Sequence, residues 1–165
     1  MRKYIFYICH ILLNDFTINH IIDNLYISSI PKYINDWNII KKLNIDTVIT
    51  LNEEWELSLI DYAKGIENIN IYNFSTPDYN PVKYDDILKI LLYIHENKNN
   101  VLVHCKAGVG RSGMIIICYL IYYYGMKPNE AYIRARKGRN KIKFRYISKQ
   151  WKEIMNFYLR TKKNK

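Results

Sequence analysis

The stretch Val101–Gly113, VLVHCKAGVGRSG, decides the fold. It begins as an apolar, β-branched run typical of a buried strand and leads through a glycine-bearing loop into Ser112–Tyr124, an almost wholly apolar stretch typical of a central helix. In this order of strand, loop and helix, backbone N–H groups and a helix N-terminus surround one point, which favours binding of a phosphate-like anion. Three glycines let the loop curl and let an anion approach its backbone: Gly108, Gly110 and Gly113.

Outward from this stretch, strands and helices alternate along the chain. Apolar alternation predicts strands at 24–28, 46–51, 68–73 and 100–104. Helical spacing predicts helices at 33–43, 54–64, 83–97, 112–124, 128–137 and 148–160. Gly125 is expected to end the central helix and Pro128 to open the next one. The alternation predicts an α/β fold, a central and mostly parallel sheet with helices on both faces.

Length and composition indicate one globular domain. The chain has 165 residues, of which 49% are hydrophobic and 24% charged. We expect a domain at 20–160, an N-terminal extension packed on it at 1–19, and a basic tail at 161–165. Three cysteines are too few for a disulfide scaffold and favour a reducing compartment, hence a cytoplasmic or nuclear location.

The N-terminal stretch is similar to a weak signal peptide. A basic start precedes the short apolar segment Tyr4–Leu13, but no small-residue cleavage site follows, so we favour a helix or strand packed on the core. No apolar run approaches the roughly 20 residues of a bilayer span. We expect a monomer without a membrane span.

Positive charge is concentrated in the last third of the chain. The net charge is +10, and the segment Lys127–Lys165 contains 14 Lys and Arg residues against only Glu130 and Glu153. A solvated helical surface with a basic tail would explain this. A field that draws in anionic substrates would explain it equally well.

Cys105 and Arg111 lie where they could act on a bound anion. A free cysteine has a pKa of about 8.5, and helix N-termini and nearby cations lower it toward the reactive thiolate. The planar guanidinium of Arg111 can hold two phosphate oxygens. Ser112 can hydrogen-bond the thiolate and later help it leave, and His104 is expected to fix the loop by hydrogen bonds. A buried structural cysteine beside a glycine turn is the alternative, but it leaves the rest of the pattern unexplained.

The stretch HCKAGVGRSG resembles the HCxxGxxR[ST]G signature of the cysteine-dependent protein tyrosine phosphatase superfamily. The chain is similar to its small, atypical dual-specificity branch, including dual-specificity phosphatase 23 and Cdc14-type catalytic domains, over roughly residues 20–160. The resemblance implies hydrolysis of phosphotyrosine and phosphoserine or phosphothreonine through a phosphocysteine, with no metal and no cofactor. It implies that the phosphate binds to the loop residues Lys106, Ala107, Gly108, Val109, Gly110 and Arg111.

The resemblance also implies a general acid on an upstream loop. Pro77 and Pro81 bracket such a segment, and Asp78 follows proline, as the acid does in many members of the family. Asp78 could instead only cap the next helix, and Asp85 and Asp86 are competitors that fall in the first turns of that helix.

A glutamine late in the chain places the hydrolytic water in relatives, which makes Gln150 the candidate. The usual Arg-Pro-Gly before it is replaced here by Gly138-Arg139-Asn140-Lys141, so an ordinary surface glutamine is an open alternative.

The signature does not select the substrate. Lys106 adds a second cation, as in phosphoinositide phosphatases and Cdc14-type enzymes, whereas Val109 stands where the former often have another lysine. Phosphorylated proteins are the expected substrates. The alternatives are RNA 5′-phosphate ends, phosphoinositides, or a non-catalytic role in binding phosphorylated partners.

Overall fold

The computed structural model describes residues 16–57 and 68–163. The expectation for Tyr4–Leu13 therefore lies outside the described residues. The helix expected at 54–64 is described only at its start, as α3 (Glu54–Leu57). Residues 58–64 lie outside the described residues as well.

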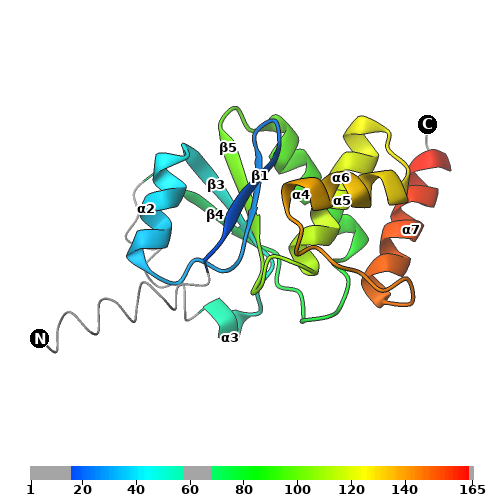
Figure 1. Ribbon diagram of the computed structural model, residues 1–165, viewed down its shortest axis with the longest axis horizontal. Coiled ribbons are helices and arrows are strands. Elements are labelled where there is room, and N and C mark those ends of the chain that lie inside the picture. Colours follow the sequence, from blue (N-terminus) through cyan, green and yellow to red (C-terminus); the bar gives the residue numbers. More distant parts are fainter. Residues whose placement is uncertain (1–15, 58–67, 164–165) are drawn as a thin grey trace, which may run out of the picture.

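A five-stranded sheet forms the centre of the molecule (Figure 1), in the order β1-β2-β5-β3-β4. Its strands are β1 (Ile18–Ile22), β2 (Leu25–Ser28), β3 (Ile45–Thr50), β4 (Asn70–Asn73) and β5 (Asn100–His104). Only β1 runs antiparallel to its neighbour; the other pairs are parallel. This confirms the expected α/β class with a mostly parallel sheet.

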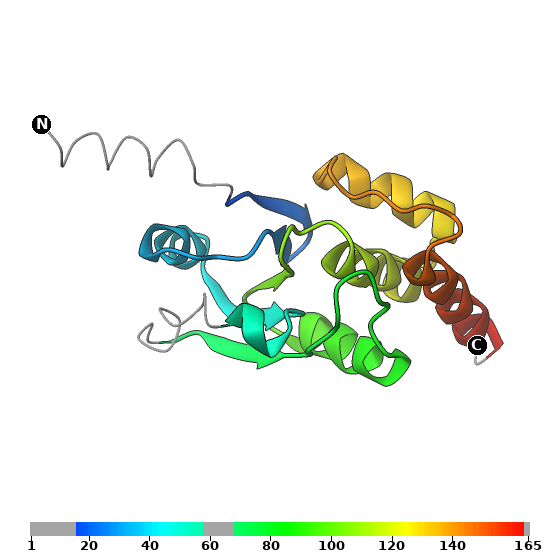
Figure 2. The same cartoon turned by 90° about the horizontal axis from the view of Figure 1, so that it is seen from below.

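Helices cover both faces of the sheet, as expected. The helix α2 (Ile34–Lys42) lies on one face and the remaining long helices lie on the other (Figures 1 and 2). These are α4 (Tyr84–Glu96), α5 (Arg111–Tyr124), α6 (Pro128–Gly138) and α7 (Lys149–Lys163). Within the described part of the chain, no helix is long and apolar enough to cross a membrane.

The central strand β5 is buried from both sides, and its alternating side chains divide the core. Val101 and Val103 belong to the large apolar cluster beneath α4 to α7, whereas Leu102 belongs to the smaller cluster of Trp37 and Ile40 beneath α2. Burial on both faces explains why this strand reads as a continuous apolar run.

Local sequence signals set several helix ends. Asp36 accepts hydrogen bonds from the backbone N–H groups of Lys32 and Tyr33 at the start of α2, at 2.8 and 3.0 Å. At the end of α5, Gly125 adopts a φ of 65°, and Pro128 begins α6, both as the sequence predicts.

The strand β1 was not predicted. Its segment, INHII, is short and interrupted by polar residues, and it is stabilised by antiparallel pairing with β2. It begins at Ile18, so the expected domain start at residue 20 falls inside it. At the other end, α7 continues through Lys163, into the segment expected as a basic tail.

Candidate active site

The loop between β5 and α5 lies at the edge of the sheet where the parallel strands end. Because β5 is flanked by β2 and β3, segments that follow these neighbouring strands reach the same edge. At Gly108, φ is 65°, and an added Cβ would lie 2.3 Å from the carbonyl oxygen of Ser28. Only glycine fits this point of the loop.

Cys105 lies at the base of this loop. Its side chain is nearly buried, and its Sγ is 3.2 Å from Oγ of Ser112, on the first turn of α5. This hydroxyl gives the sulfur a polar partner, which an inert core cysteine does not need.

Arg111 is held rigidly beside Cys105. One terminal nitrogen, Nη1, donates to Glu56 Oε2 at 3.0 Å, to the Leu51 carbonyl at 3.1 Å and to the Thr76 carbonyl at 2.8 Å. Nε is buried and has no hydrogen-bond partner among the described residues, and Nη2 makes only a long bond to Glu56 Oε1 at 3.4 Å, so both nitrogens have an N–H left for an anion. Burial alone would lower the pKa of Arg111, but hydrogen bonds to Glu56 and nearby negative charges raise it.

Glu56 is a site residue that the sequence did not reveal. It is buried on α3, where it also accepts hydrogen bonds from the Asn52 side chain at 3.0 Å and the Glu53 N–H at 2.9 Å. Burial raises its pKa, but the Arg111 guanidinium and the other donors outweigh this and lower it. The sequence feature that could have indicated this role is the group of acidic residues Glu53, Glu54 and Glu56. They follow shortly after the end of β3, at the same edge of the sheet as the loop.

Asp78 approaches the site from the loop between β4 and α4. Its side chain is about half exposed, and its Oδ1 lies 3.6 Å from Nη2 of Arg111. The competing carboxylates Asp85 and Asp86 lie in the first turn of α4. Of these three, only Asp78 is paired with Arg111 among the described ion pairs.

Gln150 is also brought to the site. It lies at the start of α7, nearly buried, and its Nε2 donates to the carbonyl of Asn80 at 3.1 Å. A Cβ at Gly110 would lie 3.0 Å from its Oε1, so the amide packs against the loop backbone. Gln150 therefore links the Asp78 loop to the loop that surrounds Cys105.

Arg139 fixes the loop from outside. It is buried, and it donates to the carbonyls of Gly108 at 2.6 Å and Ala107 at 3.0 Å, and to Oδ1 of Asn19 on β1 at 2.7 Å. Its role was missed because Arg139 stands in a segment that departs from the pattern of relatives. Two further hydrogen bonds go to the carbonyl and the hydroxyl of Thr17, at 3.1 and 3.0 Å, and burial lowers the pKa of Arg139.

The role expected for His104, fixing the loop by hydrogen bonds, stays a prediction. The ring is fully buried, and a hydrogen bond with the backbone of Cys105 acts on its pKa. The backbone carbonyl of His104 accepts from the Leu51 N–H at 3.0 Å. Burial lowers the pKa of His104 to about 4, so the ring is neutral near pH 7.

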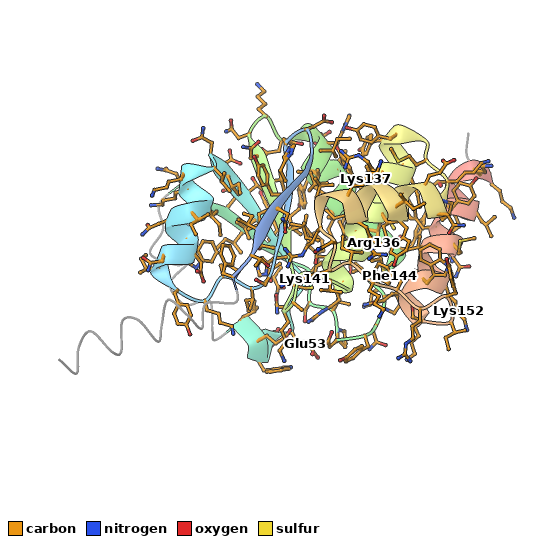
Figure 3. The ribbon with its side chains drawn as sticks, in the orientation of Figure 1. Glu53, Arg136, Lys137, Lys141, Phe144 and Lys152 are labelled. Carbon is orange, nitrogen blue, oxygen red and sulfur yellow. The ribbon has the colours of Figure 1, made fainter. Side chains whose placement is uncertain are left out.

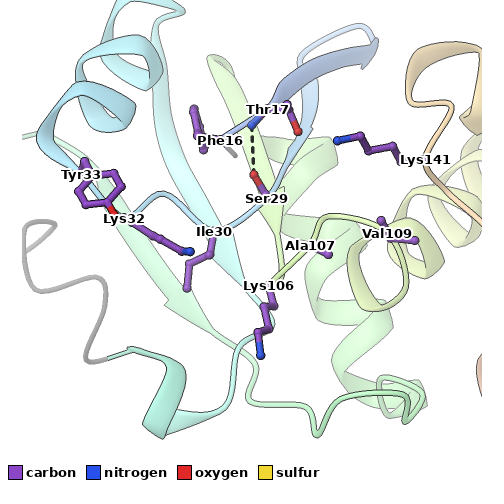
Figure 4. A pocket seen from close by; sticks show the side chains of 10 residues that line it. All are labelled: Phe16, Thr17, Ser29, Ile30, Lys32, Tyr33, Lys106, Ala107, Val109 and Lys141. Carbon is purple, nitrogen blue, oxygen red and sulfur yellow. Dashed lines mark hydrogen bonds between the residues drawn. The ribbon is translucent and has the colours of Figure 1, made fainter. Parts of the chain in front are cut away.

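A hollow of about 330 Å³ adjoins the loop on the side of β1 and β2 (Figure 4). Lys32 and Lys141 extend toward it from opposite sides, and Lys106, Ala107 and Val109 contribute from the loop. In the described ranges, no group of three His, Cys, Asp or Glu side chains is arranged to hold a metal ion.

The chain is similar to known proteins in sequence and in fold. The family described as dual specificity phosphatase, catalytic domain, matches residues 25–159. The chain is 33% identical over 123 residues to phosphatidylglycerophosphate phosphatase PTPMT1 of Arabidopsis thaliana, which covers 72% of this chain and 36% of that protein. It is 36% identical over 88 residues to the dual specificity protein phosphatase CDC14A of Mus musculus, covering 51% of this chain and 13% of that protein.

The fold is equally well represented among solved structures. The crystal structure of Tk-PTP in its active form superposes with a TM-score of 0.76 at 24% identity, over 90% of this chain and 99% of that one. The chain spans about a third of the length of the Arabidopsis relative. From its sequence, this chain belongs to the dual-specificity phosphatase catalytic-domain family, within the cysteine-based phosphatase superfamily that its signature resembles.

Proposed function

We propose that the protein hydrolyses phosphate monoesters through a covalent phosphocysteine at Cys105. The observation that supports this most strongly is the pairing of a Ser112-bonded sulfur with a buried guanidinium whose Nε is unpaired among the described residues. Such an arrangement stabilises an anion with three charged oxygens and presents a nucleophile to its phosphorus.

In the first step, the Cys105 thiolate attacks phosphorus and forms an S–P bond. The bond between phosphorus and the leaving oxygen breaks, and its electron pair stays on that oxygen, which takes a proton from Asp78. Arg111 holds two of the equatorial oxygens through Nε and Nη2, which its contacts with Glu56 orient toward the loop.

In the second step, water replaces the sulfur. The Asp78 carboxylate takes a proton from the water as its oxygen attacks phosphorus, the S–P bond breaks, and inorganic phosphate leaves. Ser112 donates to the departing thiolate. Gln150, which spans the two loops, is the residue that we assign to placing this water.

For the substrate, we propose a phosphate monoester on a phospholipid head group. The relative that matches 72% of this chain is named for phosphatidylglycerophosphate, and the lysines of the adjoining hollow suit the anionic remainder of such a molecule. Phosphorylated proteins, expected from the signature, are the second candidate, because the chain also matches CDC14A.

The mechanism is tested with a soluble aryl phosphate. We expect Cys105→Ser to lower turnover at least about a thousandfold, whereas Cys118→Ser, at a buried cysteine on α5, keeps it. Asp78→Ala should lower kcat by about 100-fold or more for poor leaving groups, and Asp85→Ala should not. Full turnover of Cys105→Ser would refute the phosphocysteine.

The substrate class is tested by comparing rates on a phosphotyrosine peptide, a phosphothreonine peptide, phosphatidylglycerophosphate in vesicles and 5′-triphosphorylated RNA. We expect the highest kcat/KM on the phospholipid. A higher value on either peptide would favour the second candidate.

A further inference from the structure

The large apolar side chains with the highest exposure in the described residues lie around the candidate active site. They are Tyr79, Ile147, Tyr146 and Trp55, with exposed fractions of 83%, 79%, 70% and 64%. The next most exposed, Ile133 on α6 at 59% and Leu159 on α7 at 54%, lie on other elements. Large apolar side chains that are exposed together near one site indicate an interaction surface.

Contacts link Trp55 and Tyr146 to segments of the site, and Tyr79 and Ile147 lie next to such residues in the chain. Trp55 lies next to Glu56 on α3, and Nζ of the loop residue Lys106 is 5.4 Å from the centre of its ring. Tyr79 directly follows Asp78. The ring of Tyr146 lies 5.4 Å from that of Trp151 on α7, whose first turn binds the Asp78 loop through Gln150.

The figures place these segments on one side of the molecule. In Figure 1, α3, the loop between β4 and α4, and the start of α7 all lie along the lower edge. Figure 2 views the molecule from that side and shows α3 and this loop in front. We call this side, defined by Trp55, Tyr79, Tyr146 and Ile147, the docking face.

The backbone at Tyr79 supports a role for its exposed ring. Tyr79 adopts a φ of 60°, a left-handed conformation that is strained for a bulky residue. Such outliers concentrate at functional sites, because the surrounding structure must hold them in place. Here the Asp78 loop is held by Gln150 and by Nζ of Lys149, 3.3 Å from the Asn80 side chain.

Lysines and acidic residues both lie beside these apolar groups. Nζ of Lys106 lies over the ring of Trp55, Nζ of Lys149 lies 3.3 Å from the side chain of Asn80, and residues 140–152 contain five Lys and Arg residues and no Asp or Glu. The acidic residues are Glu53 and the exposed Glu54 before Trp55, and Asp78 before Tyr79. Figure 3 shows Lys141, Lys152 and Glu53 in the lower half of the molecule. Exposed Trp and Tyr rings beside lysines are the composition of surfaces that bind anionic bilayers, where the rings lie at the head-group level.

We propose that the docking face binds the surface of an anionic phospholipid bilayer, with its four apolar side chains in the head-group region. This deepens the proposed function, because a bilayer in this position presents phosphate monoesters directly to the Cys105 loop. The enzyme would then act on lipid without extracting it from the membrane.

Binding is measured with the Cys105→Ser protein of all 165 residues, so that no turnover is required. Vesicles of phosphatidylcholine alone, and of phosphatidylcholine mixed with phosphatidylglycerol, are sedimented with the protein. We expect cosedimentation with the mixed vesicles, weaker binding to phosphatidylcholine, and a loss of at least about tenfold when the four apolar residues are changed to serine. The matched control, Ile133→Ser with Leu159→Ser, should bind like its parent.

A second readout is the tryptophan fluorescence of the docking face itself. The chain has three tryptophans, of which Trp37 and Trp151 are buried, so Trp55 is the one that reports on the surface. Adding the mixed vesicles should shift its emission to the blue, and Trp55→Phe should remove the shift.

Three outcomes would overturn the proposal: no binding to the mixed vesicles, equal binding by the four-serine variant, or a Trp55 emission that does not move. Capture of an acidic phosphopeptide without vesicle binding would identify a protein-binding surface instead. Failure of the phosphocysteine mechanism is a separate result, since it is read from turnover of a soluble aryl phosphate.

Discussion

At the scale of single residues, the site depends on a buried ion pair. Arg111 and Glu56 are both almost inaccessible, at 1% and 2% side-chain exposure, and their closest atoms are 3.0 Å apart. Removal of one partner leaves the other charge buried without compensation, which costs far more than loss of an exposed pair. Glu56 is therefore a positioning residue for Arg111.

Glu56→Gln should lower the free energy of unfolding by about 3 kcal/mol near pH 7. Because the pKa of Glu56 is lowered in the fold, the stability that its charge contributes is present above its ordinary pKa of 4.5 and is lost as the pH falls through the lower folded value. The difference between wild type and variant, measured by urea unfolding, should shrink at acid pH. Glu53→Gln is the neighbouring control, and an equal loss in both would contradict a specific role.

His104 gives a second, separate pH dependence. Its pKa falls from 6.5 to about 4 on burial, so the unfolded chain binds more protons between these values. Stability is full above pH 6.5 and declines by roughly 3 kcal/mol as the pH falls toward 4. His104→Gln should flatten the unfolding free energy across this window. An unchanged slope would show that another group titrates there.

At the scale of elements, the loop shape is set by steric restraint on both sides. A Cβ added to Gly108 would lie within 2.5 Å of the backbone of Ser28. On the other side, Arg139 donates a hydrogen bond to the carbonyl of Gly108. Gly125, with the same φ of 65°, has nothing within 4 Å. An alanine at Gly125 would therefore meet only the cost of the left-handed conformation, whereas an alanine at Gly108 would also clash with its neighbours.

Gly125→Ala should cost about 1 kcal/mol and leave turnover intact, since only the left-handed conformation is penalised. Gly108→Ala should cost more and abolish turnover, because the loop must move away from Ser28. Thermal unfolding and aryl phosphate hydrolysis measure both effects. Equal behaviour of the two variants would show that the contact with Ser28 is not restrictive.

Local signals also explain which elements could be predicted. The apolar β5 and α5 and the caps at Gly125 and Pro128 are encoded by adjacent residues, so their positions follow from sequence. The strand β1 depends on pairing with β2, and Glu56 and Arg139 reach the loop from about 50 and 30 residues away along the chain. No local pattern carries such long-range contacts.

At the scale of the whole molecule, the topology assembles the site. Placing β5 between β2 and β3 brings Glu56, the Asp78 loop and Arg111 to one sheet edge, and the first turn of α7 closes it through Gln150. The signature predicted Cys105 and Arg111 as neighbours. The fold supplies the residues that hold them.

The phosphocysteine itself is the most direct test of this account. The Asp78→Ala protein is mixed with an aryl phosphate that has a good leaving group, quenched in acid within one turnover, and digested for mass spectrometry. We expect one phosphoryl group on the peptide that contains Cys105, because hydrolysis without the Asp78 base is slow. Continued release of phosphate with no phosphorylated Cys105 at any time would contradict the account.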